Sequence, residues 1–72
     1  MDMSYAVWRV ACEASLTDQE KLILMKVLRG LSNPQIASDL KISMRTVKYH
    51  LTKILKKTQA KSRIELFARL ID

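Results

Sequence analysis

The sequence predicts an all-α fold, a small domain of four helices with an additional helix at its N-terminus. The 72 residues include one glycine and one proline, and strand-like alternation of apolar and polar residues is absent. Ser or Thr is followed three residues later by Glu or Gln at Thr17, Ser32 and Ser62, a pattern typical of helix starts. These observations predict helices over residues 4–14, 18–29, 33–40, 44–58 and 63–71.

Each predicted boundary has a local chemical reason. Thr17 caps the helix over 18–29, and Gly30 ends it because glycine readily takes the left-handed conformation. Ser32 caps the next helix, which tolerates Pro34 in its first turn, where a backbone N–H has no helical partner. Ser43 is the expected cap of the helix over 44–58. Because only residues 41–43 separate these last two helices, the pair forms a helix-turn-helix.

Composition excludes several classes of function. One cysteine rules out an internal disulfide framework, and no Cys/His cluster has the spacing of metal ligands. Because no Ser/His/Asp set, glycine-rich phosphate loop or paired carboxylates occur, we expect no enzyme and no cofactor. The sequence contains no secretory segment and no long apolar run, which predicts a cytoplasmic protein without a membrane partner.

Positive charge is concentrated in one part of the chain. The formal net charge is +6, and residues 41–63 hold eight lysines and arginines and no carboxylate. On the helix over 44–58, Val47, Leu51 and Ile54 form the apolar stripe, with Met44 and Leu55 beside it. The opposite side is basic and carries Arg45, Tyr49, Thr52, Lys53 and Lys56, with Lys48 on its flank. A basic helix after a short turn indicates a surface for double-stranded DNA.

Residues 16–66 resemble the LuxR-type (FixJ, NarL, GerE-like) DNA-binding domain of bacterial transcription regulators. The resemblance rests on Leu16-Thr17 with Glu20, Gly30-Leu31-Ser32-Asn33, Ile36-Ala37, Leu40, Ile42-Ser43, Thr46-Val47-Lys48 with His50, Ile54, and Lys61-Ser62-Arg63. It implies a domain over residues 16–72, with residues 1–15 as a helical extension. It also implies that the helix over 44–58 enters the major groove and that the last helix forms a dimer interface.

The resemblance also assigns DNA contacts. Lys48, Tyr49 and Thr52 occupy positions where the family reads bases, and Thr46 occupies a position that often touches a phosphate. To the base contacts we add the outward-facing Arg45, while Lys48 has a phosphate contact as its alternative. From the basic segment, the expected phosphate contacts are Lys53, Lys56, Lys57, Lys61 and Arg63. We expect His50 to be partly packed or to face a phosphate.

Several positions depart from the family pattern, and two of them lie at the ends of the helix over 44–58. Met44 stands where Glu is common, so the start of the recognition helix lacks an acid. Gln59 lies where the family usually has glycine, and it must either take a left-handed conformation or end the helix differently.

Some apolar residues exceed what a minimal domain needs. Leu22 and Met25 lie opposite the core face of the helix over 18–29, and we expect the Tyr5, Trp8 and Cys12 stripe to cover them, within the chain or across a dimer. The last helix has two apolar faces, one with Ile64 and Phe67 and the other with Leu66 and Leu70. One face serves the core and the other is left for a partner, most simply a second copy. The expected dimer or partner interface comprises Leu66, Leu70, Phe67, Trp8, Leu22 and Met25.

Three functions remain open on the sequence alone. The first is a sequence-specific transcription regulator that binds duplex DNA, expected to be a homodimer. The second is a protein that antagonises or assists another transcription regulator through its apolar surfaces. The third, a basic amphipathic segment on a membrane or on nucleic acid without specificity, is disfavoured by the outward Tyr49 and Thr52.

Overall fold

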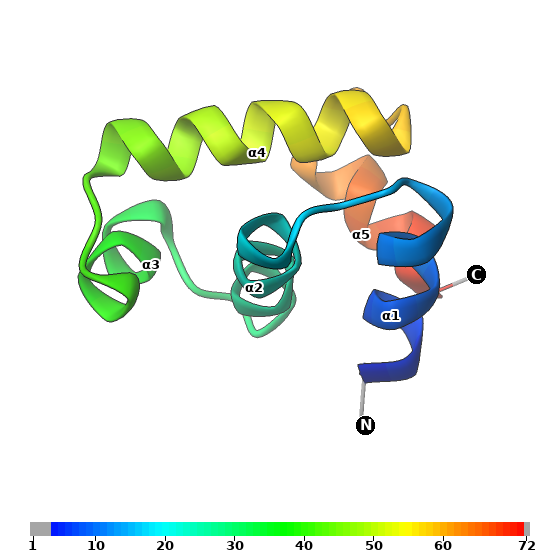
Figure 1. Ribbon diagram of the computed structural model, residues 1–72, viewed down its shortest axis with the longest axis horizontal. Coiled ribbons are helices and arrows are strands. Elements are labelled where there is room, and N and C mark those ends of the chain that lie inside the picture. Colours follow the sequence, from blue (N-terminus) through cyan, green and yellow to red (C-terminus); the bar gives the residue numbers. More distant parts are fainter. Residues whose placement is uncertain (1–3, 72) are drawn as a thin grey trace.

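Five helices make up the computed structural model, which describes residues 4–71. They are α1 (Ser4–Glu13), α2 (Asp18–Leu28), α3 (Asn33–Leu40), α4 (Met44–Thr58) and α5 (Arg63–Ile71). The predicted all-α fold is confirmed, and the helix bounds differ from the predicted ones by one residue at two C-terminal ends. Residues 1–3 of the expected N-terminal extension lie outside the described residues. In Figure 1, α4 runs along one side of the molecule, with α2 and α3 on one flank and α1 and α5 near its C-terminal end.

Side-chain caps begin the helices as the sequence predicts. Thr17 and Glu20 form a complete capping box, since the Glu20 N–H donates to Thr17 Oγ1 (3.1 Å) and the Thr17 N–H donates to Glu20 Oε1 (2.8 Å). Ser32 and Gln35 form a second capping box. Ser43 Oγ accepts the Thr46 N–H at 3.1 Å, which satisfies one of the unpaired donors at the start of α4.

Left-handed residues follow four of the helices. Ser15 follows α1 with φ 55° and Gly30 follows α2 with φ 83°, while Lys41 and Gln59 end α3 and α4 with φ 57° and 59°. Gln59 therefore accepts the left-handed conformation, one of the two outcomes expected from the missing glycine. After it, the Ala60 N–H donates to the Leu55 carbonyl at 2.9 Å, and Ala60 is buried in the core. This apolar anchor offsets the strain of a left-handed non-glycine residue, which is about 1–2 kcal/mol.

The core lies where α2, α3 and α4 meet. Val47, Leu51 and Ile54 are buried as predicted, and α4 packs through this stripe against α2 and α3. Met44 is an exception, because its side chain is exposed although it was expected beside the buried stripe. It is the first residue of α4 and adjoins the turn, so few neighbours surround it.

The face that α1 buries differs from the expected one. α1 packs against α2 and α5 through Val7, Val10 and Ala11. The predicted cover by Tyr5, Trp8 and Cys12 within the chain is therefore wrong, because these residues lie on the outer side of α1 and Trp8 is 58% exposed. Cover across a dimer stays a prediction. The buried residues are smaller and lie on the other side of the helix, which allows α1 to approach two helices closely.

The two apolar residues on α2 have different surroundings. Met25 is partly buried and packs against the core, so we remove it from the expected partner interface. Leu22 remains exposed, as expected for a residue opposite the core face.

The face that α5 buries is also a correction. Leu66 and Leu70 are 0% and 4% exposed, so they belong to the core and are not available to a partner. α5 contacts both α1 and α4, and these neighbours enclose the side that carries the two leucines. The exposed face is the other one, where Ile64 is 83% exposed and Phe67 is 37% exposed.

Over residues 4–71 no helix is long and apolar enough to cross a membrane. Within the same residues, no group of three or more His, Cys, Asp or Glu side chains could hold a metal ion.

Candidate nucleic-acid interface

The outward side of α4 is the candidate interface. Six of its side chains are exposed and none is acidic: Arg45, Lys48, Tyr49, Thr52, Lys53 and Lys56. Figure 1 shows why this side is accessible, since α2 and α3 lie only on its opposite flank. The short turn after α3 and the buried stripe together hold the basic face outward.

The start of α4 adds a polar end to this surface. The Ser43 and Thr46 hydroxyls lie 2.8 Å apart, and Thr46 itself is half-buried. No acidic residue occurs in the first turn of α4, so the partial positive charge of the helix N-terminus is not neutralised there. The N–H groups at this helix end and the two hydroxyls can donate hydrogen bonds to a phosphate oxygen.

Tyr49 projects from the middle of the candidate interface. It is 56% exposed. The Lys53 ammonium nitrogen lies 5.1 Å from the centroid of its ring, and the His50 ring meets it edge-on with centroids 5.5 Å apart. The neighbouring Tyr49 side chain raises the pKa of Lys53 above its ordinary value.

The hydroxyl of Thr52 already has an acceptor. Thr52 Oγ1 donates to the Lys48 carbonyl at 2.9 Å, one turn earlier on α4. Its hydrogen is therefore engaged within the helix, and the side chain offers a base its methyl group and the remaining lone pair of its oxygen. Both are suited to base edges in the major groove, where thymine carries a methyl group.

Lys57 is a correction to the phosphate set. Its ammonium group pairs with Glu20 Oε1 at 2.7 Å and donates to the Ser15 carbonyl at 3.4 Å. Burial raises the pKa of Glu20, but hydrogen bonds from Lys57 and Thr17 outweigh that effect and leave the pKa below its ordinary value. Lys57 thus joins the end of α4 to the start of α2 as an internal ion pair.

Arg63 is a second correction. Its guanidinium donates to Asn33 Oδ1 at 2.9 Å and to the Leu31 carbonyl at 2.5 Å, so it ties the start of α5 to the segment before α3. The three remaining cations of the predicted phosphate set are all exposed: Lys53, Lys56 and Lys61.

His50 is half-buried beside the apolar stripe. Its Nδ1 atom is buried and has no hydrogen-bond partner among the described residues. The packed interpretation of His50 agrees with this placement.

Sequence reasoning missed three contacts. The pairs Glu20–Lys57 and Asn33–Arg63 join residues 37 and 30 positions apart, and no local sequence pattern predicts such distant pairs. The contact of Lys53 with Tyr49 has the four-residue spacing of helix neighbours, a signal that could have revealed it.

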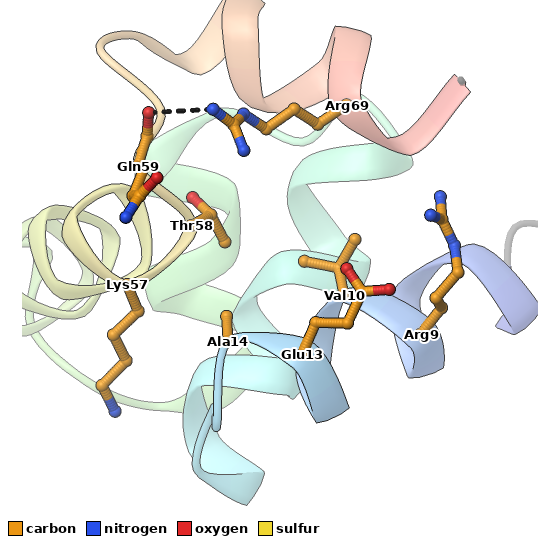
Figure 2. Close-up of a pocket in the computed structure, with 8 residues that line it drawn as sticks. All are labelled: Arg9, Val10, Glu13, Ala14, Lys57, Thr58, Gln59 and Arg69. Carbon is orange, nitrogen blue, oxygen red and sulfur yellow. Dashed lines mark hydrogen bonds between the residues drawn. The ribbon is translucent and has the colours of Figure 1, made fainter.

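A cavity of about 430 Å³ lies where α1, the end of α4 and α5 meet. Figure 2 shows the residues that line it, which are Arg9, Val10, Glu13, Ala14, Lys57, Thr58, Gln59 and Arg69. Arg69 Nη2 donates to the Gln59 carbonyl at 3.2 Å, and Lys57 donates to the Ser15 carbonyl that follows α1. Two of its cations therefore serve the C-terminal ends of α4 and α1, where carbonyl groups need donors.

Comparisons with known proteins agree with this geometry. Residues 14–70 match the family described as bacterial regulatory proteins, luxR family (GerE), so the whole of α1 precedes the matched segment. The chain is 48% identical over 50 residues to a nitrate/nitrite response regulator protein homolog of Haemophilus influenzae, covering 69% of this chain and 24% of that protein.

Two further relatives show the same pattern. Nitrate/nitrite response regulator protein NarP of Escherichia coli is 47% identical over 49 residues, covering 68% of this chain and 23% of that protein. Transcriptional regulatory protein FixJ of Rhizobium meliloti is 44% identical over 48 residues, covering 67% and 24% respectively.

The chain thus spans about a quarter of the length of these curated relatives. No solved structure matches the chain. The family match covers well over half of the sequence and includes α2 through most of α5. The chain therefore belongs to the luxR family of bacterial regulatory proteins and carries its helix-turn-helix domain for DNA-binding transcription regulation.

Proposed function

We propose that this chain is a sequence-specific regulator that inserts α4 into the major groove of duplex DNA. The single observation that carries the proposal is the outward face of α4, which is exposed, basic and free of carboxylates. A major groove admits one helix, and uncharged side chains among the cations allow base recognition as well as attraction to phosphates. The family to which the chain belongs supports this function.

The proposed contacts divide into two groups. Base edges are contacted by Arg45, Lys48, Tyr49 and Thr52. Phosphates are contacted by Thr46, Lys53, Lys56 and Lys61, while Lys57 and Arg63 leave this group because their cationic groups bind within the protein. Phosphate contacts supply sequence-independent affinity, and base contacts supply the discrimination between sequences.

Selection of bound sites from random duplex DNA tests the proposal. We expect a recurrent motif to be enriched over successive rounds at moderate salt. A matched selection with a variant in which Arg45, Tyr49 and Thr52 are all replaced by alanine is the control, because it keeps Lys53, Lys56 and Lys61. Equal enrichment of the same motif by both proteins would contradict the assignment of base contacts to α4.

We further propose that two copies bind DNA together through α5. The exposed Ile64 and Phe67 support this interface, since together they leave an apolar strip on the outer side of the helix. A homodimer places two recognition helices on one duplex, and its symmetry requires a site with two related halves.

A second function is favoured by the surface of α1. Tyr5 and Trp8 are exposed with ring centroids 6.3 Å apart, and Leu22 is exposed on α2. These residues support the alternative that the chain binds another transcription regulator, which it antagonises or assists. Absence of binding to any duplex at low salt, together with a partner complex that Trp8→Ala disrupts, would favour this alternative over the first proposal.

The remaining proposals concern the whole chain. We assign it to the bacterial cytoplasm, without enzymatic activity, cofactor or membrane partner. We also divide it into a helical extension over residues 1–15 and a DNA-binding domain over residues 16–72, and the match to residues 14–70 supports a boundary near this position.

A further inference from the structure

The contact between Lys53 and the Tyr49 ring on the outward face of α4 is neither a base contact nor a phosphate contact. The Lys53 ammonium nitrogen lies 5.1 Å from the centroid of the Tyr49 ring, within the distance of about 6 Å at which a cation is attracted to an aromatic face. Both residues are exposed, and they are four positions apart on one side of the helix.

The His50 ring constrains Tyr49 further. Its ring meets that of Tyr49 at an interplanar angle of 64°, the edge-to-face arrangement that aromatic pairs favour. His50 is half-buried beside the apolar stripe, so it is anchored in the protein. Tyr49 thus contacts two neighbours on its own helix, the half-buried His50 and the exposed Lys53.

Such contacts matter because an exposed tyrosine otherwise samples several rotamers. Fixing a side chain on binding costs rotamer freedom and so weakens the affinity. A ring that is already held before the DNA arrives avoids part of that loss. The gain applies only to the sequence whose base edge fits the held ring, and it therefore increases discrimination more than overall affinity.

We propose that Lys53 is a positioning residue for base recognition, because its ammonium group on the Tyr49 ring holds that side chain in the orientation that meets a base edge. The inference rests on the proposed DNA-binding function and assigns a second role within the same interface. A lysine that contacts phosphate alone would strengthen binding to all sequences by the same factor.

The test compares variants of the full 72-residue chain on two duplexes, the selected motif and a scrambled sequence of equal composition. The variants are Lys53→Met, Lys53→Arg and the matched control Lys56→Met. The control removes an exposed lysine that lies three residues after Lys53 on α4. Fluorescence anisotropy gives the ratio of the two dissociation constants for each protein. Methionine preserves helix propensity, so folding is retained.

We expect Lys53→Met to lower this ratio about threefold, the factor that corresponds to an exposed cation–aromatic contact. Lys53→Arg should keep the ratio, because a guanidinium also stacks on aromatic rings. Lys56→Met should weaken both duplexes equally and leave the ratio unchanged. In a Tyr49→Leu background, Lys53→Met should no longer alter the ratio, since the ring on which it acts is gone.

The possible failures are distinguishable. If Lys53→Met weakens both duplexes by one common factor, the positioning role is overturned while DNA binding stands. If the unmodified chain binds neither duplex at low salt, the proposed function itself fails. NMR provides a test without DNA: the Lys53 ε-methylene protons should be shifted upfield by the ring and return to ordinary values in Tyr49→Leu, and normal shifts in the unmodified chain would overturn the contact.

Discussion

Replacing Lys57 by methionine should destabilise the fold strongly, because it leaves Glu20 charged and unpaired inside the protein. The Glu20 side chain is 2% exposed and the Lys57 side chain is 33% exposed. Removing one partner of a fully buried pair costs about 3–5 kcal/mol, and the partial exposure of Lys57 reduces the expected loss to about 2–3 kcal/mol. For a domain of this size, that loss lowers Tm by about 10–20 °C.

Thermal and urea unfolding followed by circular dichroism measure this effect at pH 7. Lys56→Met is the matched control, since its side chain is exposed and the change should stay within about 0.5 kcal/mol. The double variant Glu20→Gln with Lys57→Met should recover part of the loss, because the glutamine oxygen can still accept the Thr17 N–H and no buried charge remains. Equal stability of Lys57→Met and Lys56→Met would refute the reasoning.

The loss of stability in Lys57→Met should also depend on pH in a defined direction. Burial raises the pKa of Glu20, but the hydrogen bonds from Lys57 and Thr17 lower it below its ordinary value. A carboxyl with a lowered pKa stabilises the fold above the ordinary glutamate value of about 4.3, and this contribution is lost as the pH falls through the lowered pKa. The stability difference between the unmodified chain and Lys57→Met should therefore shrink as the pH falls below about 4.

Three further predictions concern the surface. Tyr49→Ala should reduce discrimination between selected and scrambled duplexes by about 1–3 kcal/mol, whereas Lys56→Ala should weaken both alike; equal effects of the two changes in anisotropy titrations would remove Tyr49 as a base reader. Thr52→Ser should weaken specific binding more than Thr52→Val, because the Thr52 hydroxyl is engaged with the Lys48 carbonyl and its methyl is left for the groove; the reverse order contradicts this. Ile64→Ser should lower dimer formation in sedimentation velocity without loss of Tm, since Ile64 is exposed, and an unchanged dimer fraction would exclude this face.

Local chemistry explains how much of the fold could be predicted. Thr17, Ser32 and Ser43 act on N–H groups within three residues of themselves, so their sequence signatures were sufficient to place the helix starts. The apolar stripe of α4 was equally clear because one side of that helix is strongly basic.

The faces of α1 and α5 could not be predicted in the same way. Each helix carries two apolar sides, and periodicity does not decide which side meets a neighbour. On α5 the buried side is that of Leu66 and Leu70, since α1 and α4 both pack against the helix. The choice depends on tertiary packing, which lies beyond any local window.

Some cations of the predicted phosphate set bind within the protein, for a reason that also involves tertiary packing. Lys57 and Arg63 look like the other basic residues in sequence, but their partners Glu20 and Asn33 are distant along the chain and close in the fold. Charge counting alone therefore overstated the phosphate set. The outward placement of Tyr49 and Thr52, by contrast, follows from helix geometry and agrees with the structure.

The salt dependence of DNA binding tests the central proposal most directly. Apart from Lys57, which pairs with Glu20, six cations in residues 41–63 are exposed: Lys41, Arg45, Lys48, Lys53, Lys56 and Lys61. Three of them, Lys53, Lys56 and Lys61, are assigned to phosphates, so log K for one chain should fall against log salt with a slope of about −3. A slope weaker than about −2, or no binding to any duplex at low salt, would contradict DNA binding through the basic face of α4.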